Sequence, residues 1–426
     1  MKKLILAPLA ALTLGALTGC GGSDVDYNDN TKLKIRFHVD IGSVEGMAYS
    51  QIINDFNREN EDGIKVTATF VARSAGDTTY DLELQRDMKN GTLPDIITFD
   101  APKCAEYASY GYFYDLTNQF SADEKAKFVT LNTYKGRLYG IPIQESSAGI
   151  YYNKRYFQEA GIDVSDITVD SPWDYARFKS VCASLKARHP SIVPAVMRFK
   201  DNNSEMATYL LYPFIYASGG GFVDETGKQA LGIFNSAASI RGYQFLRDLY
   251  DAGYTDYKVE EQSFYKGEAA MLLSSGWTIP LMKDYTTTFP DDRNSWGLLP
   301  YPKDVTRASA NGSWSYAIGN NPRTDKTNVI KLLKYITSAK SSKKITNATG
   351  MIPANVDAQE TYPANSAEDV LLQQLEKTSI KRPDTVGYRQ FSDTFRMVIS
   401  SLGSEDVATL VNNKATYLQS ELDKIK

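Results

Sequence analysis

Short apolar strands alternate with amphipathic helices along most of the chain. Residues 32–39 (KLKIRFHV) alternate between polar and apolar positions and predict a strand, whereas residues 47–60 carry apolar positions at helical spacing. Residues 95–99 (DIITF) form an apolar run short enough for a buried strand. This alternation indicates an α/β fold with a mostly parallel sheet. The same patterns predict further strands within 64–71, 149–152, 192–198 and 269–273, and further helices within 79–90, 174–186, 229–251, 326–338 and 391–426.

The first residues are typical of an export signal. Two lysines precede the apolar stretch 4–17, which is too short to span a bilayer and suits a signal-peptide core. The stretch ends Leu-Thr-Gly-Cys at Cys20, which resembles a bacterial lipobox, in which the cysteine is diacylated. An ordinary signal peptide cut at a small residue is the alternative. We expect a signal peptide over 1–19, and a lipid-bearing cysteine with a polar tether over 20–31.

Composition narrows the possible chemistry. A length of 426 residues suggests two or three domains, and a net charge of −4 argues against a broad nucleic-acid-binding face. With two histidines and three cysteines, few groups could bind zinc or serve as the base of a catalytic triad. The common phosphate-loop, dinucleotide and nucleophile-elbow motifs are missing. We therefore expect no cofactor, no metal site and no nucleic-acid partner.

Eight short motifs follow one another across the chain: 93–97 (LPDII), 135–142 (KGRLYGIP), 149–154 (GIYYNK), 171–174 (SPWD), 264–271 (FYKGEAAM), 275–277 (SGW), 296–302 (WGLLPYP) and 349–355 (TGMIPAN). In content and order they resemble the extracellular solute-binding proteins that feed ABC importers, in the branch that includes the maltodextrin binders. The resemblance implies a periplasmic-binding-protein-like fold, with two α/β lobes, discontinuous crossings and a ligand cleft between the lobes.

The resemblance also implies that the chain passes between the lobes more than once. Aligned to the motifs, the crossings fall near 144–148, 299–302 and 350–355. The N-terminal lobe would then hold 32–144 and 303–352, and the C-terminal lobe 145–302 and 353–426. Because Cys104 and Cys182 fall in different lobes, we expect two buried thiols rather than a disulfide.

A sugar ligand needs two kinds of partner. Its hydroxyls need directed hydrogen bonds, best from charged groups, and its C–H faces need a flat aromatic platform. The resemblance implies that Trp277 is such a platform, with a core tryptophan as the alternative. It implies that Glu145 binds ligand at the first crossing, with an exposed hinge glutamate as the alternative. Tyr209 lies in the segment that supplies a stacking tyrosine, although Tyr212 or Tyr216 could take that place.

Other candidates follow strands or crossings in the resemblance. They are Asp40 and Ser43 after the first strand, Asp100 after residues 95–99, Ser313 and Trp314 after the second crossing, and Tyr388 and Arg389 before the last helices. The chain departs from the maltodextrin branch at residue 207, where alanine lies near that branch's second cleft glutamate. This difference argues against long maltodextrins and leaves a smaller or different sugar open.

These observations predict a binding protein rather than an enzyme. We expect a monomeric lipoprotein on the outer face of a bacterial cell membrane, which captures a sugar or oligosaccharide by hinge closure and delivers it to the transmembrane subunits of an ABC permease. Three alternatives stay open. The same fold could bind a polyamine, a phosphate ester or a peptide; a secreted carbohydrate-active enzyme could use paired carboxylates such as Glu145 and Asp100; or a surface lipoprotein could bind a protein partner.

Overall fold

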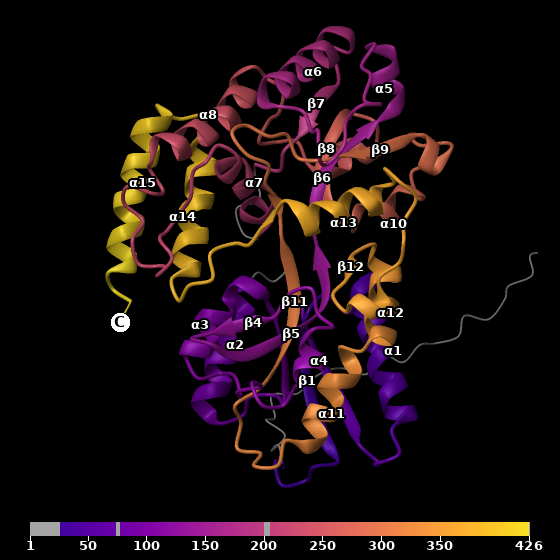
Figure 1. Ribbon diagram of the computed structural model, residues 1–426, viewed down its shortest axis with the longest axis vertical. Coiled ribbons are helices and arrows are strands. Elements are labelled where there is room, and N and C mark those ends of the chain that lie inside the picture. Colours follow the sequence, from indigo (N-terminus) through magenta and orange to yellow (C-terminus); the bar gives the residue numbers. More distant parts are fainter. Residues whose placement is uncertain (1–25, 74–76, 200–204, 426) are drawn as a thin grey trace, which may run out of the picture.

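Two lobes make up the computed structural model of the protein, which describes residues 26–73, 77–199 and 205–425 (Figure 1). The expected signal peptide and Cys20 lie outside the described residues. The strands are β1 (Lys32–His38), β2 (Lys65–Val71), β3 (Ile96–Asp100), β4 (Asn132–Tyr134), β5 (Arg137–Ser146), β6 (Ala148–Asn153), β7 (Val193–Val196), β8 (Ala269–Ser275), β9 (Trp296–Leu299), β10 (Ser309–Ala310), β11 (Gly312–Ile318), β12 (Ile352–Pro353) and β13 (Ser379–Ile380).

The helices connect these strands and cover their sheets. They are α1 (Val44–Glu59), α2 (Asp77–Asn90), α3 (Cys104–Ser109), α4 (Ala122–Lys125), α5 (Lys154–Glu159), α6 (Tyr175–Arg188), α7 (Met206–Ala217), α8 (Ala237–Asp251), α9 (Glu261–Tyr265), α10 (Thr278–Met282), α11 (Thr327–Ile336), α12 (Ala339–Thr349), α13 (Ala367–Lys377), α14 (Tyr388–Ser401) and α15 (Val407–Leu422), with the 3-10 turns η2 (Ala101–Lys103), η3 (Asp292–Asn294) and η4 (Val356–Ala358).

The N-terminal lobe is built on a seven-stranded sheet in the order β12-β5-β11-β3-β1-β2, with β4 paired to β5. Successive residues of a strand point to opposite faces of a sheet. In β3, Ile96 therefore packs with α1, α11 and α12 on one face, whereas Ile97 and Phe99 pack with α2 and α3 on the other. Both faces are covered, which explains why Ile96, Ile97 and Phe99 of the predicted strand at 95–99 are all buried.

The C-terminal lobe has a four-stranded sheet in the order β7-β8-β6-β9. Helices α6, α7, α8, α14 and α15 share one core with one face of this sheet, and α9, α10 and α13 share a second core with the other face. Helices α14 and α15 pack against each other, and α15 also packs on α8 (Figure 1). This lobe is therefore also an α/β unit with helices on both faces, as the α/β prediction requires.

Both main sheets are mixed, so the prediction of a mostly parallel sheet is wrong. Among the described strands of these sheets, β1 pairs parallel with β2 and β3, and β7 pairs parallel with β8. The pairings of β11 with β3 and β5, and of β6 with β8 and β9, are antiparallel. The strands that enter or leave a lobe run against their neighbours, and the local alternation of strands and helices carries no information about that direction.

The chain first passes between the lobes where β5 ends at Ser146 and β6 begins at Ala148. It returns at Asn311, between β10, which packs in the C-terminal core, and β11 of the N-terminal sheet (Figure 1). It leaves again after η4, which packs on α12. The second and third passages thus lie later in the chain than the expected positions 299–302 and 350–355.

The lobes also meet backbone to backbone. Gly276 follows β8 and Gly350 follows α12, and a Cβ on Gly276 would lie 2.0 Å from the carbonyl oxygen of Gly350. Gly350 also has a φ of +72°, in the left-handed region that other residues rarely adopt. Glycine at both positions therefore allows a contact that no side chain could enter.

Arg323 fixes the start of the described chain to the N-terminal lobe. Its guanidinium is fully buried with Asp95, and the distance from Nε to Oδ1 is 2.8 Å. Its other N–H groups donate to the backbone carbonyl oxygens of Tyr27, Asp29 and Lys32. A buried ion pair is stable when its remaining donors are also satisfied, and here the backbone supplies the acceptors. We call this set of contacts the Arg323 clamp; it lies at the amino ends of β1 and β3.

No helix within the described ranges combines the length and the apolar content needed to cross a membrane. Cys104 and Cys182 are both buried and unpaired. Cys104 packs in the N-terminal lobe and Cys182 in the C-terminal lobe. The expectation of two buried thiols is thereby confirmed.

We predict that Arg323→Gln lowers the free energy of unfolding by about 3–5 kcal/mol, because it leaves the buried Asp95 carboxylate without its cation. Urea unfolding followed by circular dichroism measures the change. The control is Arg307→Gln, which breaks the exposed ion pair with Asp170 and should cost at most about 1 kcal/mol. Equal losses in the two variants would contradict a special role for the clamp.

Candidate functional site

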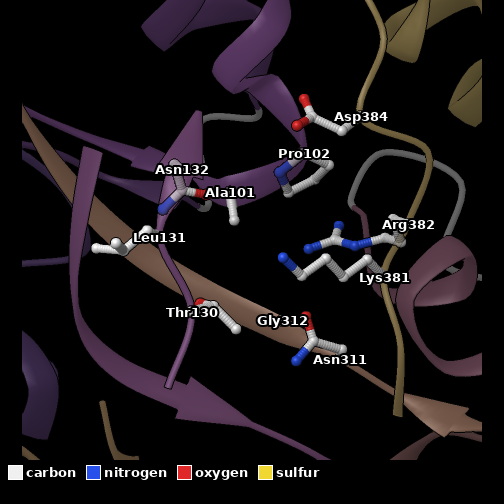
Figure 2. A pocket seen from close by; sticks show the side chains of 10 residues that line it. All are labelled: Ala101, Pro102, Thr130, Leu131, Asn132, Asn311, Gly312, Lys381, Arg382 and Asp384. Atoms are coloured by element: carbon white, nitrogen blue, oxygen red, sulfur yellow. The ribbon is translucent and has the colours of Figure 1, made fainter. Parts of the chain in front are cut away.

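A pocket lies between the two lobes (Figure 2). One wall comes from the N-terminal lobe, and the opposite wall comes from the segment between β13 and α14. The second passage between the lobes forms its floor. The pocket is lined by Ala101, Pro102, Thr130, Leu131, Asn132, Asn311, Gly312, Lys381, Arg382 and Asp384. Segments that are far apart in the sequence thus meet at one place, where two bodies can enclose a ligand.

An ion pair joins the lobes beside this pocket. Arg382, before α14, donates from Nη1 and Nη2 to the two carboxylate oxygens of Asp100, at 2.8 and 2.6 Å. The two side chains are only 3% and 12% exposed. Nη1 also donates to Glu205 at 3.3 Å and to the Tyr388 hydroxyl at 3.0 Å. A paired fork of this kind is among the strongest polar contacts in proteins, so we call it the Arg382–Asp100 bridge.

A second interlobe contact forms around Asp81 in α2. Its carboxylate accepts from Arg389 of α14, from the Tyr107 hydroxyl and from Lys103, whose Nζ is 3.3 Å from both oxygens. Arg389 also lies 3.9 Å from Glu106. Because Arg389 is 41% exposed, this contact is more open to solvent than the Arg382–Asp100 bridge and holds the lobes less firmly.

Two of the expected aromatic platforms lie together on the C-terminal lobe. The rings of Tyr209, in α7, and Trp277, after β8, have centroids 6.0 Å apart at an angle of 44°. The Tyr209 hydroxyl donates to Ser146 Oγ at 2.8 Å, and Ser146 Oγ donates to the Gly312 carbonyl at 3.0 Å. Tyr209 is therefore attached to both the first and the second passage between the lobes.

Trp314 lies in β11 on the N-terminal lobe, with one ring face covered by a cation. The guanidinium carbon of Arg73 is 3.9 Å from the ring centroid, a distance at which cation–π attraction is substantial. Arg73 donates to Glu45 at 2.6 and 3.1 Å, and Gln144 donates to the same carboxylate at 3.1 Å. A ligand can stack on Trp314 only on its other face or by displacing Arg73.

Glu145 is fully buried in β5 rather than exposed. Burial raises the pKa of Glu145 to about 8, although the Thr130 hydroxyl and the charge of Lys381 lower it in part. Thr130 donates to Oε1, and Oε2 has no hydrogen-bond partner among the described residues. At neutral pH this side chain is therefore mainly a protonated acid, which can donate a hydrogen bond.

Two of the remaining candidates, Ser43 and Tyr212, form hydrogen bonds that support the fold. Ser43 caps α1, since its Oγ accepts from Gly46 at 3.0 Å and donates to the Asp40 carbonyl at 2.6 Å. Asp40 itself is half-buried. Tyr212 is fully buried, and its hydroxyl joins two chain segments by accepting from the Asn311 amide and donating to the Ile380 carbonyl.

The last two candidates, Tyr388 and Ser313, lie in α14 and β11. Tyr388 is fully buried, with its hydroxyl donated to Glu205. Ser313 occupies the β11 position opposite Glu145 in the strand register.

In the described ranges, no group of three or more His, Cys, Asp or Glu side chains could hold a metal ion. The site presents groups for directed hydrogen bonds and aromatic faces.

The sequence motifs miss Arg382, Glu205 and Arg73. None of these residues lies in a segment that resembles the family. Arg382 meets Asp100 across 282 positions of sequence, and single-sequence patterns carry no signal for so distant a contact. The only hint is that charged residues cluster between 381 and 389, where Tyr388 and Arg389 were already candidates.

Residues 42–343, more than half of the chain, match the profile of the family described as "Bacterial extracellular solute-binding protein". The chain is 21% identical over 442 positions to a Streptococcus pneumoniae protein named "Maltooligosaccharide ABC transporter solute-binding lipoprotein", which covers 98% of this chain and 97% of that one. It is 28% identical over 191 residues to the "Multiple sugar-binding protein" of Streptococcus mutans. That match covers 44% of this chain and less than half, 42%, of the relative.

The crystal structures of the GacH receptor of Streptomyces glaucescens, described in the unliganded form and in complex with acarbose, are similar to this chain with a TM-score of 0.76. The alignment covers 93% of this chain and 99% of that one at 20% identity. At this level of identity the likeness bears on the fold, and it agrees with the two lobes described above.

We predict that Glu145→Gln changes how stability depends on pH. The folded-state pKa of about 8 exceeds the usual value of about 4.3, so between these values the folded protein binds more protons than the unfolded chain. The free energy of unfolding of the natural protein should therefore fall as pH rises from about 5 to about 8. Glu145→Gln should lack this component of the fall, which amounts to about 1.4 kcal/mol per unit of pKa shift. Urea unfolding at pH 5, 7 and 9 measures both proteins, and parallel curves would contradict the prediction.

Proposed function

The chain belongs to the bacterial extracellular solute-binding proteins, and from this premise we propose that its solute is a sugar or oligosaccharide. The observation that carries the proposal is the meeting, between two lobes, of aromatic rings with charged hydrogen-bonding groups. Tyr209 and Trp277 provide the rings, and Asp100 and Arg389 provide the charged groups. This combination suits sugars because rings match C–H faces and charged groups bind hydroxyls strongly. The names of two relatives support the same class of solute. One is a maltooligosaccharide ABC transporter solute-binding lipoprotein, and the other is a multiple sugar-binding protein.

We assign roles to the candidate residues according to their surroundings. Trp277 and Tyr209 are the platforms of the C-terminal lobe, and Trp314 is a platform of the N-terminal lobe that competes with Arg73. Asp40, Asp100, Glu145, Ser313 and Arg389 provide polar contacts to the sugar. Ser43, Tyr212 and Tyr388 support these groups, since their hydroxyls are used by a helix cap, a chain passage and Glu205.

The proposed mechanism is hinge closure about the passages between the lobes. A ligand that contacts both lobes favours the closed form by its greater affinity for it. The residues at the passages, such as Ser146 and Asn311, bond to side chains of α7, so a change in lobe angle and a change at the Tyr209 platform are linked. We infer that the closed protein then presents both lobes to the transmembrane subunits of an ABC permease.

Three alternative outcomes are separable from this proposal. Incubation with labelled oligosaccharides should return them unchanged, whereas release of shorter products would identify a carbohydrate-active enzyme. A stabilising response to a polyamine, a phosphate ester or a peptide, with none to any sugar, would change the solute class. Protein capture without any small-molecule response would favour a lipoprotein that binds a protein partner.

We predict that a thermal-shift panel of glucose, maltose, lactose, maltotriose and maltoheptaose contains at least one stabilising sugar. A sugar present at one hundred times its Kd adds about 2.7 kcal/mol to the free energy of unfolding. Trp277→Ala should weaken that sugar about tenfold by removing a stacking face. The matched control is Tyr417→Ala, an exposed aromatic on α15, which should leave the Kd unchanged. If Trp277→Ala also leaves the Kd unchanged, the platform is misassigned.

We further predict that Cys20→Ser releases the protein from the membrane. Two acyl chains on one cysteine hold a protein firmly, whereas a chain without them has no comparable anchor. In cells of a bacterial expression host, the natural sequence should sediment with membranes and the variant should remain in the soluble or secreted fraction. Cys104→Ser, which changes a buried thiol, is the control and should still sediment. Equal sedimentation of the natural protein and Cys20→Ser would exclude the anchor.

A further inference from the structure

Arg382 lies in the contact between the lobes, although no family-like motif contains it. Its side chain is 3% exposed, and it lines the interlobe pocket (Figure 2). Its guanidinium carbon lies 5.5 Å from the centroid of the Tyr209 ring. Arg382 therefore lies next to the ring that we propose as a platform, within reach of a ligand bound there.

Both terminal nitrogens of the guanidinium donate hydrogen bonds within the protein. These nitrogens, Nη1 and Nη2, face Asp100, Glu205 and the Tyr388 hydroxyl. Nε is also buried, yet it has no acceptor among the described residues. A buried donor without a partner is unfavourable, so a ligand oxygen placed there would regain that free energy. The other contacts hold the guanidinium plane in place, which prepares this donor for a ligand.

The Arg382 side chain also forms the contact that would hold the lobes together when no sugar is bound. Asp100 ends β3 in the N-terminal lobe, whereas Arg382 and its other partners Glu205 and Tyr388 belong to the C-terminal lobe. Both members of the Arg382–Asp100 bridge are largely removed from water, where salt screens an ion pair much less than at the surface. Opening the cleft would separate a paired arginine and carboxylate, which favours the closed arrangement.

We propose that Arg382 is a specificity-determining residue of the cleft: its Nε–H donates to an oxygen of the bound sugar, and its bridge to Asp100 holds the lobes together before the sugar arrives. The proposal rests on the proposed function for its ligand. The interlobe bridge itself depends only on the protein. The two parts therefore call for one measurement with a sugar and one without.

The first experiment measures the distance between the lobes in the absence of any sugar. Spin labels at Lys89→Cys in α2 and Lys258→Cys in the C-terminal lobe, both exposed positions, report the distance by pulsed electron resonance. Arg382→Gln and Asp100→Asn should each shift the distribution to longer distances. The double variant should add nothing further, because both single changes remove the same contact. It also avoids leaving one buried charge unpaired, which protects the test if a single variant unfolds.

The second experiment measures the Kd, by calorimetry, of the sugar from the panel above that gives the largest thermal shift. Arg382→Gln should raise this Kd at least tenfold. Arg307→Gln, which removes an arginine whose ion pair lies within the C-terminal lobe, should leave both the Kd and the distance unchanged. An unchanged distance in Arg382→Gln overturns the bridge, and an unchanged Kd overturns the contact to the sugar. If no sugar of the panel binds the natural protein, the proposed function fails, while the distance measurement still tests the bridge.

Discussion

The passage of one chain back and forth between two sheets is the constraint on which the rest of the structure depends. One residue separates β5 from β6, and one residue separates β10 from β11. In each of these pairs, one strand belongs to the N-terminal lobe and the other to the C-terminal lobe. In the N-terminal sheet, β5 leads out of the lobe and β11 leads back into it, so these two neighbours pair antiparallel and contribute to the mixed pairing of that sheet. The cleft is then necessarily lined by segments from distant parts of the sequence. Residues at the passages, such as Ser146 and Asn311, take part in both the support of the fold and the geometry of the site.

The buried charges of the molecule are stabilised in three different ways. Asp95 is paired with the fully buried Arg323, and backbone carbonyls accept from further Arg323 donors. Asp100 is paired with Arg382 across the lobes. Glu145 lacks an ion pair among the described residues, and burial raises its pKa to about 8 although the charge of Lys381 lowers it in part, so it mainly stays protonated. The first arrangement stabilises one lobe, the second links two lobes, and the third makes a strand sensitive to pH; these differences follow from which partner each carboxyl meets.

Much of the fold is predictable from the sequence, because periodicity reports local burial. The strand predicted at 95–99 appears as β3, displaced by one residue, and the helix predicted at 326–338 appears as α11. Strand direction and the later passages depend on pairing between remote segments, which periodicity does not encode. The candidate site shows the same division. Trp277 follows its strand as expected, but the burial of Glu145 and the interlobe contact of Arg382 depend on neighbours more than one hundred residues away.

The Arg323 clamp has a consequence for the geometry of the protein at a membrane. It fixes the chain from Tyr27 onward at the amino ends of β1 and β3, whereas the cleft residue Asp100 lies at the carboxyl end of β3. A lipid on Cys20 would be joined to the clamp by the part of the tether that leads to Tyr27, seven positions further on. Fully extended, seven residues span roughly 25 Å. The seven residues of β1 separate the clamp from the cleft by about 20 Å more. With the tether and β1 extended away from the membrane, the protein would hold its cleft away from the bilayer. To contact a membrane protein with both lobes, the protein would have to lie on its side.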